Sequence, residues 1–107
     1  MKISVVVATY KRPRCLKRCL ESLRAQQRAA DEVIVVCQGD DGESPAVVRD
    51  VARSFDGATA WVGLRIDEAN IAKAENAGVA RARGEVVAFI DDDATAGPSW
   101  LRLMERW

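Results

Sequence analysis

The sequence contains no histidine, only three cysteines and no long apolar run. Without histidine or a CxxC pair, a zinc site is not expected. Cys15 and Cys19, four residues apart, are predicted to be small apolar residues on one face of a helix, and Cys37 leaves an odd count. No stretch is apolar enough to cross a bilayer, and the start of the chain does not look like a signal peptide. We therefore expect reduced thiols, a cytoplasmic location and no membrane segment in this chain.

The chain also lacks an excess of either charge, because 16 basic residues balance 16 acidic ones. This balance gives no reason to expect nucleic acid or an anionic membrane as a partner. The basic residues are unevenly distributed, however, and a group of them shares a segment with a single acid, Glu21. The group consists of Lys11, Arg12, Arg14, Lys17, Arg18, Arg24 and Arg28. It is either the solvated face of a helix or a positive mouth for a phosphorylated ligand.

Apolar runs typical of buried strands alternate with segments of helical periodicity across the 107 residues. Strands are predicted at 3–8, 33–37, 58–64 and 86–90. Helices are predicted to begin at Pro13, at Ser44-Pro45 as N-cap and first residue, after an N-cap at Asn70, and at Pro98. The third helix carries many small residues, which allow close packing, and is expected to run to about Arg83 with Gly84 ending it.

Strands separated by helices predict parallel pairing with right-handed crossovers, hence one α/β domain with a three-layer, Rossmann-like architecture. In such sheets, ligands bind at the carboxyl ends of the strands. Four segments should therefore meet there. They are Thr9-Tyr10, Gln38 to Asp41, the loop before Asn70, and Asp91 to Asp93.

The three consecutive aspartates after the last predicted strand carry the sharpest chemical signal. Neighbouring carboxylates repel one another and are costly to leave unpaired near a core. In an extended segment Asp91 and Asp93 point to one side and Asp92 to the other. Two hard oxygen ligands on one side suit Mg²⁺ or Mn²⁺, with ligand phosphates completing the shell. The alternative is that these acids only terminate a strand at the surface.

These segments resemble glycosyltransferase family 2, a family of inverting transferases with the GT-A fold. The resemblance rests on five pieces in the family's order that together cover nearly the whole chain. They are ATYKRP (8–13) after an opening strand, CLKRCLESLRAQ (15–26), DEVIVV (31–36), AENAG (74–78) and RGEVVAFIDDDATAGPSWL (83–101). It implies that residues 1–107 form the N-terminal, nucleotide-sugar-binding part of such a domain, with a nucleoside-diphosphate sugar as donor.

The resemblance also implies roles for single residues. Thr9 and Tyr10 would lie against the nucleoside, Asp91 and Asp93 would form the DxD pair, and Asp93 would hold the diphosphate through Mg²⁺ or Mn²⁺. The complete set expected at the nucleotide is Thr9, Tyr10, Arg12, Gln38, Asp40, Asn76, Asp91 and Asp92. Tyr10 and Asn76 also have plain structural interpretations, as a cover for the sheet edge and as a satisfied polar group on a helix.

The sequence departs from the family pattern at several positions. Family members commonly carry acids after the second strand, where this chain has Gln38, and Gln38 or Asp40 could take over the contact with the base. Glu75 stands where arginine is frequent, and Ala94 where an acid is frequent. These departures leave the base, the sugar and the acceptor unassigned.

An inverting transferase also needs a general base, and no residue here is an obvious one. The family supplies that carboxylate and the acceptor site from the second half of the domain. We therefore expect either a piece of a longer protein or a shortened relative. An uncovered sheet edge and an apolar face formed by Trp100, Met104 and Trp107 are expected to favour self-association.

Two other functions remain open from the sequence. One is a module that binds nucleotide or metal without turnover, and the other is an unrelated Mg²⁺-dependent α/β domain. A receiver or an aspartate-nucleophile phosphatase would have acids after the first strand. Here the first strand ends in Ala8-Thr9-Tyr10, which argues against both.

Overall fold

The computed structural model describes residues 1–55 and 57–106, over which strands and helices alternate. The strands are β1 (Ile3–Thr9), β2 (Glu32–Gln38), β3 (Ala60–Ile66) and β4 (Val86–Phe89). The helices are α1 (Pro13–Arg24), α2 (Ser44–Ser54), α3 (Ile71–Arg81) and α4 (Trp100–Glu105). The predicted order of elements is confirmed. Trp107, which the sequence assigned to the apolar face of the last helix, lies outside the described residues.

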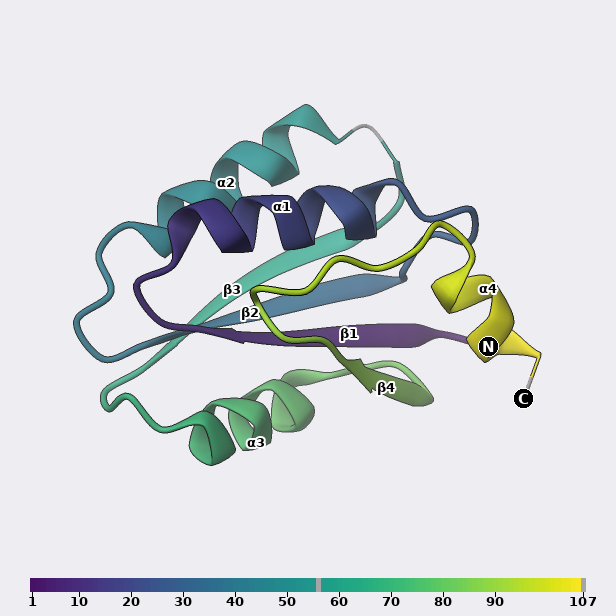
Figure 1. Ribbon diagram of the computed structural model, residues 1–107. Helices are drawn as coiled ribbons and strands as arrows, with labels where there is room; N and C mark the ends of the chain where they lie inside the picture. The colour runs from purple at the N-terminus through teal and green to yellow at the C-terminus, as the bar shows by residue number, and fades with distance from the viewer. Residues whose placement is uncertain (56, 107) are drawn as a thin grey trace.

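The four strands form one parallel sheet in the order β3-β2-β1-β4. Helices α1 and α2 cover one face of this sheet, and α3 covers the other (Figure 1). The chain steps outward from β1 to β3 through the first two helices and then returns through α3 to place β4 on the far side of β1. This is the predicted α/β three-layer arrangement, and its strand order reverses direction between β1 and β4.

The two central strands, β1 and β2, are buried on both faces, as their β-branched runs predict. The larger core lies beneath α1 and α2, where Val5 and Val35 pack with Leu16. The smaller core lies beneath α3, where Val6 meets Ala74. A side chain at Gly78 of α3 would place its Cβ 2.4 Å from a methyl group of Val6, so the prediction that small residues bring this helix close to the sheet is confirmed there.

Several predicted boundaries are wrong by one or two residues, including the ends of the first, second and fourth strands, which run 3–9, 32–38 and 86–89. The third strand runs 60–66 rather than 58–64, because its pairing with β2 starts at Glu32 and continues to Gln38. Glu43, not Ser44, precedes the first residue of α2, and its own side chain makes no capping bond. The third helix ends at Arg81, where the following residue turns extended.

Gly84 is predicted to end α3 as its C′ residue, a position where glycine usually has a left-handed backbone, and this is wrong. Among the described glycines only Gly39 has a positive φ, of 56°. Gly84 instead passes directly over β1, where a Cβ would lie 2.6 Å from Oγ and 2.7 Å from N of Ser4. Glycine is required here by the close approach of two chain segments rather than by the helix end.

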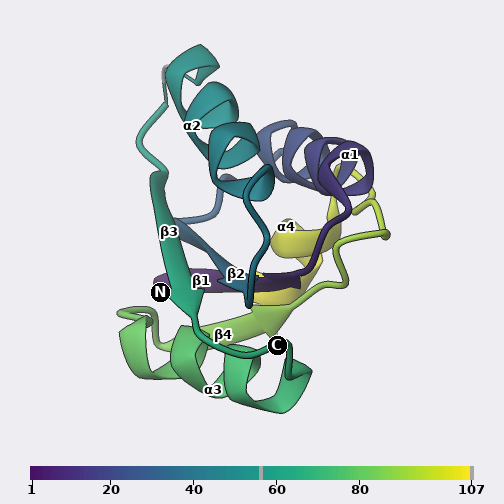
Figure 2. The same ribbon diagram turned by 90° about the vertical axis from the view of Figure 1, so that its left-hand side faces the viewer.

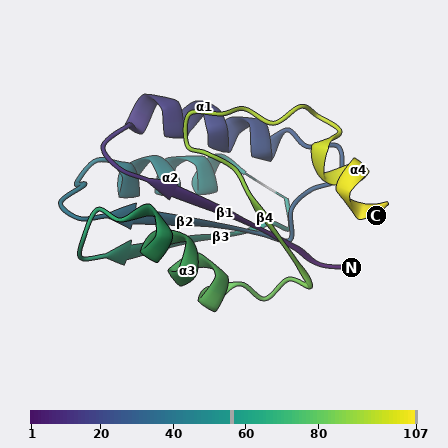
Figure 3. The ribbon, with the colours of Figure 1, turned by 60° about the horizontal axis from the view of Figure 1, so that its bottom comes forward.

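After β4 the chain turns back along α1 before it forms α4 (Figure 3). The amide of Ala96 donates to Oγ of Ser22 at 3.0 Å, and Nε2 of Gln26 donates to the carbonyl of Gly97 at 2.7 Å. Pro98 belongs to this returning segment, so the prediction that it opens the last helix is wrong, and α4 starts at Trp100.

The apolar residues near the end of the described chain divide into two groups. Leu101 is fully buried, and Trp100 and Met104 pack against the larger core, whereas Leu103 is 49% exposed. Cys15, expected in the core beside Cys19, is only half-buried at the edge of the buried stripe of α1. Self-association stays a prediction. None of the helices formed by residues 1–55 and 57–106 has the length and apolar character needed to cross a membrane.

Candidate functional site

The site lies at the carboxyl ends of β1 and β4, where the strand order reverses. Figure 2 looks along the sheet from this side and shows the ends of the strands together with the start of α1. In open α/β sheets, ligands bind outside the carboxyl ends of the strands at the point where the strand order reverses, which here lies between β1 and β4. The hydroxyl of Thr9, the last residue of β1, donates to Oδ2 of Asp92 at 2.9 Å. This buried bond joins the two strand ends directly.

A cavity of about 380 Å³ opens beside this bond. All four segments that the sequence predicted to meet contribute to its wall. The lining residues are Ala8, Tyr10, Arg12, Gln38, Ala69, Ile71, Asp91, Asp92 and Asp93. The convergence of the four strand ends is therefore confirmed, and a volume in this range suits a part of a small-molecule ligand.

The three aspartates differ in their surroundings. Asp91 and Asp93 are exposed, whereas Asp92 is 6% exposed and is held by Thr9. The pattern of exposure matches the prediction, but the predicted extended segment is wrong: β4 ends at Phe89, and the aspartates lie in a turn in which the amide of Ala94 donates to the carbonyl of Asp91 at 3.0 Å. The guanidinium of Arg12 lies 3.4 Å from Oδ2 of Asp93 and 3.8 Å from Oδ1 of Asp92. The cavity thus combines carboxylates with one cation that reaches it from the start of α1.

A divalent cation would fit this donor set. The carboxylates of Asp91 and Asp93 are hard oxygen ligands, they are exposed, and both line the same cavity. Over residues 1–55 and 57–106, no group of three or more acidic or cysteine side chains is arranged to hold a metal ion. Other ligands, such as phosphate oxygens and water, would therefore have to complete the shell, as is usual for Mg²⁺.

Tyr10 forms an exposed wall of the cavity and is held at its hydroxyl. That hydroxyl donates to Oδ1 of Asp40 at 2.8 Å, and Nζ of Lys11 donates to Oδ2 of the same carboxylate at 3.0 Å. These two hydrogen bonds, from Lys11 first and Tyr10 second, lower the pKa of Asp40. Asp40 does not line the cavity, so its position fits the support of Tyr10 better than a direct contact with a base.

Gln38 ends β2 and lines the floor of the cavity at 6% exposure. Its Nε2 donates to the carbonyl of Thr9 at 3.2 Å. This bond uses part of the amide's hydrogen-bonding capacity and leaves further donor and acceptor positions. Asn76, in contrast, is exposed on α3 and is not among the residues that line the cavity, whose wall on that side comes from Ala69 and Ile71. Its role at the nucleotide stays a prediction.

Asp41 is a residue whose importance the sequence did not reveal. It is 1% exposed and accepts bonds from the amide of Lys11 at 2.7 Å and from Oγ of Ser44 at 2.6 Å. The amides of Glu43 and Ser44 also donate to it, at 3.2 and 3.1 Å. Burial opposes its ionisation, but these bonds, led by that of Ser44, prevail and lower its pKa. The spacing Asp41-x-x-Ser44, before a helix, was the available signal.

Arg65 was also missed. It lies near the end of β3, and its guanidinium donates to the carbonyl of Gly39 at 2.7 Å and to the carbonyl of Asp41. Arg65 thereby links the end of β3 to the segment that follows β2. In the sequence, an exposed basic residue near the end of a strand does not indicate such a contact.

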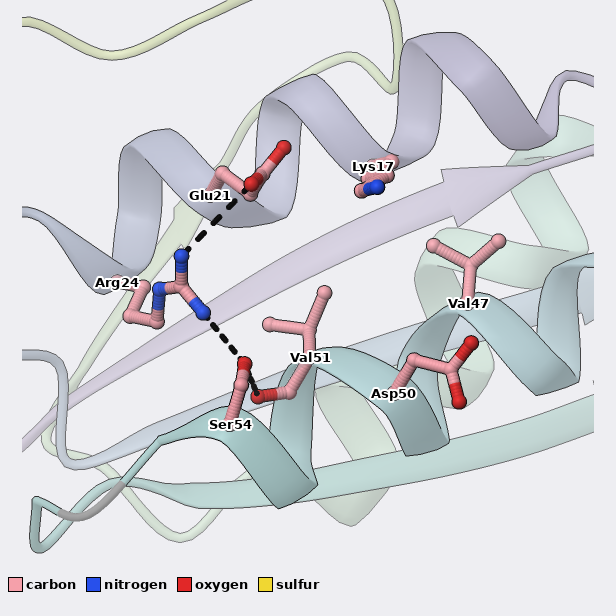
Figure 4. Close-up of a pocket in the computed structure, with 7 residues that line it drawn as sticks. All are labelled: Lys17, Glu21, Arg24, Val47, Asp50, Val51 and Ser54. Carbon is pink, nitrogen blue, oxygen red and sulfur yellow. Dashed lines mark hydrogen bonds and ion pairs between the residues drawn. The ribbon is translucent and has the colours of Figure 1, made fainter.

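The basic cluster of the sequence reaches the cavity at only one residue, Arg12. Two others, Lys17 and Arg24, line a separate hollow of about 340 Å³ between α1 and α2 (Figure 4). There Arg24 lies 3.7 Å from Glu21 and also bonds Ser54. Most of the cluster therefore forms a solvated helix face. The predicted positive entrance for a phosphorylated ligand consists only of Arg12, with Lys11 nearby.

Cys19 lies on the buried side of α1. Burial first, and then the charges of Asp92, Asp91 and Asp93, raise the pKa of its thiol to about 12. The thiol therefore stays protonated at neutral pH and is not a nucleophile.

The sequence is similar to known glycosyltransferases over nearly all of its length. It is 31% identical over 104 residues to a putative glycosyltransferase, EpsH, of Bacillus subtilis. This match covers 97% of this chain and 29% of that protein. It is 35% identical over 108 residues to the glucosyl-dolichyl phosphate glucuronosyltransferase of Haloferax volcanii. This match covers 97% of this chain and 33% of that protein. The chain thus spans about a third of the length of these relatives.

The fold is likewise similar to solved structures of this kind. The mannosyltransferase PcManGT from Pyrobaculum calidifontis, solved in complex with GDP-Man and Mn²⁺, matches with a TM-score of 0.88 and 26% identity over 99% of this chain and 32% of its own. S. aureus TarS 1-349 in complex with UDP matches in fold, with a TM-score of 0.83 and 24% identity over 99% of this chain and 31% of its own.

The predicted GT-A fold is therefore confirmed. The family model for glycosyl transferase family 2 matches residues 4–106. Together with the strand-end cavity and the similarity to proteins of this kind, this match shows that the chain belongs to glycosyltransferase family 2.

Proposed function

We propose that the cavity at the ends of β1 and β4 binds the nucleoside-diphosphate part of a sugar donor. The observation that carries this proposal is the single cavity wall that unites Tyr10, Gln38, Arg12 and the three aspartates. An aromatic ring and an amide suit a nucleobase. A guanidinium and a metal-binding pair of carboxylates suit a diphosphate.

Within this site, Asp91 and Asp93 would hold Mg²⁺ or Mn²⁺ on the exposed side of the segment, and Arg12 would lie beside the phosphates. A bound divalent cation would neutralise the diphosphate as it leaves the anomeric carbon. Asp92 would keep the two strand ends together through Thr9, with which it already bonds. PcManGT, a structural relative, was solved with GDP-Man and Mn²⁺, which supports this assignment.

The complete protein would transfer the sugar to an acceptor hydroxyl with inversion. That reaction requires a general base near the acceptor. Because the chain spans about a third of its relatives' length, we assign the base and the acceptor site to a part of the protein outside this chain. The chain itself would supply donor binding and the stabilisation of the leaving group.

The test is calorimetric titration of the chain with UDP, GDP and dTDP, each with and without Mn²⁺. We expect one nucleotide to bind in a metal-dependent manner, and Asp93→Ala to weaken that binding by about ten-fold or more, because one ligand of the cation is lost. The matched control is Asp50→Ala, which removes an exposed acid of α2 outside the cavity.

Three results would contradict the proposal. Binding that is equally strong without Mn²⁺ and in Asp93→Ala would remove the metal role from the aspartates. The absence of any nucleotide binding by a folded sample would show that this cavity does not hold the donor by itself. A nucleotide affinity lost in both variants would point to a general effect of charge rather than to the cavity.

A further inference from the structure

The wall of the cavity that carries Tyr10 depends on the segment between β2 and α2. Gly39 turns this segment with a φ of 56°, and a Cβ placed on it would lie 3.4 Å from the ring of Tyr10. The next residue, Asp40, accepts the hydrogen bond of the Tyr10 hydroxyl. Asp41 then accepts the bond of the Lys11 amide. Two consecutive residues of the segment therefore bond the Tyr10-Lys11 pair, and Gly39 beside them leaves room for the ring.

The backbone at this pair is not in a relaxed conformation. Lys11 has a φ of 53°, a left-handed value that a residue with a side chain rarely adopts. It persists because Asp41 holds its amide and Asp40 holds its ammonium group. Any shift of the segment would therefore release Lys11 and, with it, the ring of Tyr10.

Arg65 fastens the segment from the other side. Its guanidinium donates from two different nitrogens to two carbonyls, those of Gly39 and Asp41, which flank Asp40. The planar fork of arginine can bridge two acceptors in this way, whereas the point charge of lysine cannot fix both directions. The backbone bond from the amide of Gly39 to the carbonyl of Ile66 reinforces the same junction with β3.

We propose that Arg65 is a positioning residue of the donor site, which holds residues 39–41 so that Tyr10 is presented to the nucleobase in one orientation. This inference rests on the proposed function for the identity of the ligand. It assigns to Arg65 an effect on nucleotide affinity and on the choice between bases, although its side chain does not line the cavity. Preorganisation of a wall lowers the cost of ordering it when a ligand binds.

The position of Tyr10 can be measured without any ligand, because Tyr10 is the only tyrosine in the sequence. Labelling with 3-fluorotyrosine therefore gives one ¹⁹F resonance, which reports on this ring alone. We expect Arg65→Met to shift or broaden this resonance. Arg49→Met is the matched control: Arg49 shares with Arg65 the wall of a hollow of about 400 Å³ between α2 and β3, and it is exposed on α2. We expect the resonance of the control to match that of the original chain.

The second measurement is the affinity for the nucleotide identified by titration with Mn²⁺. We expect Arg65→Met to raise Kd about ten-fold for that nucleotide. We also expect the ratio of the Kd values for UDP and GDP to move closer to one. Both quantities should be unchanged in Arg49→Met. Arg65→Lys keeps the charge and most of the stem, so we expect it to restore stability to unfolding but not the ¹⁹F signal or the ratio between bases. If Arg65→Met fails to fold, Arg65→Lys replaces it in both measurements.

The outcomes separate this inference from the proposed function. An unchanged ¹⁹F resonance in Arg65→Met and Arg65→Lys would overturn the positioning role, whatever the chain binds. Full rescue of the signal and of the base ratio by Arg65→Lys would overturn it as well, because charge alone would then suffice. If the original chain binds no nucleotide, the proposed function fails. The ¹⁹F resonance of the Arg65 variants then still decides the positioning role: an altered resonance supports it, and an unaltered one overturns it.

Discussion

Asp41 shows how much of the site depends on one buried side chain. Its carboxylate accepts four hydrogen bonds, two on each oxygen, from Lys11, Glu43 and Ser44. These partners belong to the loop after β1 and to the start of α2, so one residue fixes two neighbouring segments. A carboxylate can accept all four bonds, whereas an amide has only one accepting oxygen.

Asp41→Asn is therefore expected to destabilise the fold. Its NH₂ group would face a backbone amide that also donates, which leaves a buried donor without an acceptor. We expect a loss of about 2 kcal/mol in the free energy of unfolding, measured by urea denaturation. The control is Asp40→Asn at the neighbouring, exposed position, which should shift the midpoint little because its bonds are formed in water. Equal shifts in the two variants would show that Asp41 is not the anchor described.

At the scale of the elements, α3 illustrates packing that excludes side chains. It lies against β1 at Gly78, where a Cβ would come within 2.4 Å of Val6. A contact of that length forces the helix or the valine to move. The strand residue Gly63 of β3 differs, because a Cβ there would meet nothing closer than 4.0 Å. The same substitution should therefore have opposite effects at the two glycines.

We expect Gly78→Ala to lower the free energy of unfolding by about 1–3 kcal/mol, because overpacking outweighs the better helix propensity of alanine. Gly63→Ala should be neutral or stabilise by up to about 1 kcal/mol, since it restricts the unfolded chain and its Cβ would meet only Val48, at an ordinary contact distance of 4.0 Å. Thermal and urea unfolding of both variants test this. The double variant Val6→Ala with Gly78→Ala should recover part of the loss. Stabilisation by Gly78→Ala alone would refute the close contact.

At the scale of the whole molecule, periodicity was enough to predict the architecture. The apolar runs of β1 and β2 and the helical spacing of α1 indicated the order of the elements, and the carboxyl-end rule then brought Tyr10, Gln38 and the aspartates together. The rest could not be predicted because it depends on pairs far apart in sequence. Arg65 reaches carbonyls 24 and 26 residues earlier, and no local pattern records such a partner.

Boundaries were missed for a related reason. The ends of β3 are set by the length of β2, its partner, and not by its own residues. Gly84 looked like a helix end, but its reason is the approach of β1 at Ser4. In both cases a tertiary contact overrode a local signal.

Carboxylates secure both ends of β2. At the amino end, Asp31 accepts the amide of Ile3 at 2.7 Å, and Glu32 accepts the hydroxyl of Ser4 at 2.6 Å. At the carboxyl end stands Asp41. Burial raises the pKa of each, but hydrogen bonds from their neighbours outweigh it, so all three have pKa values below the ordinary 3.8 for aspartate and 4.5 for glutamate. The folded chain therefore holds fewer protons than the unfolded chain in mild acid.

A group whose pKa is lowered by folding stabilises the fold above its unfolded pKa and loses that effect as pH falls through its folded value. We therefore expect the urea midpoint to fall steeply below about pH 4. With no histidine in the sequence, the midpoint should change little from about pH 7 to pH 6. Glu32→Gln should lower the midpoint at neutral pH but flatten its decline in acid. A midpoint that rises on acidification, or a decline equally steep in Glu32→Gln, would mean that these carboxylates do not hold β2 in place.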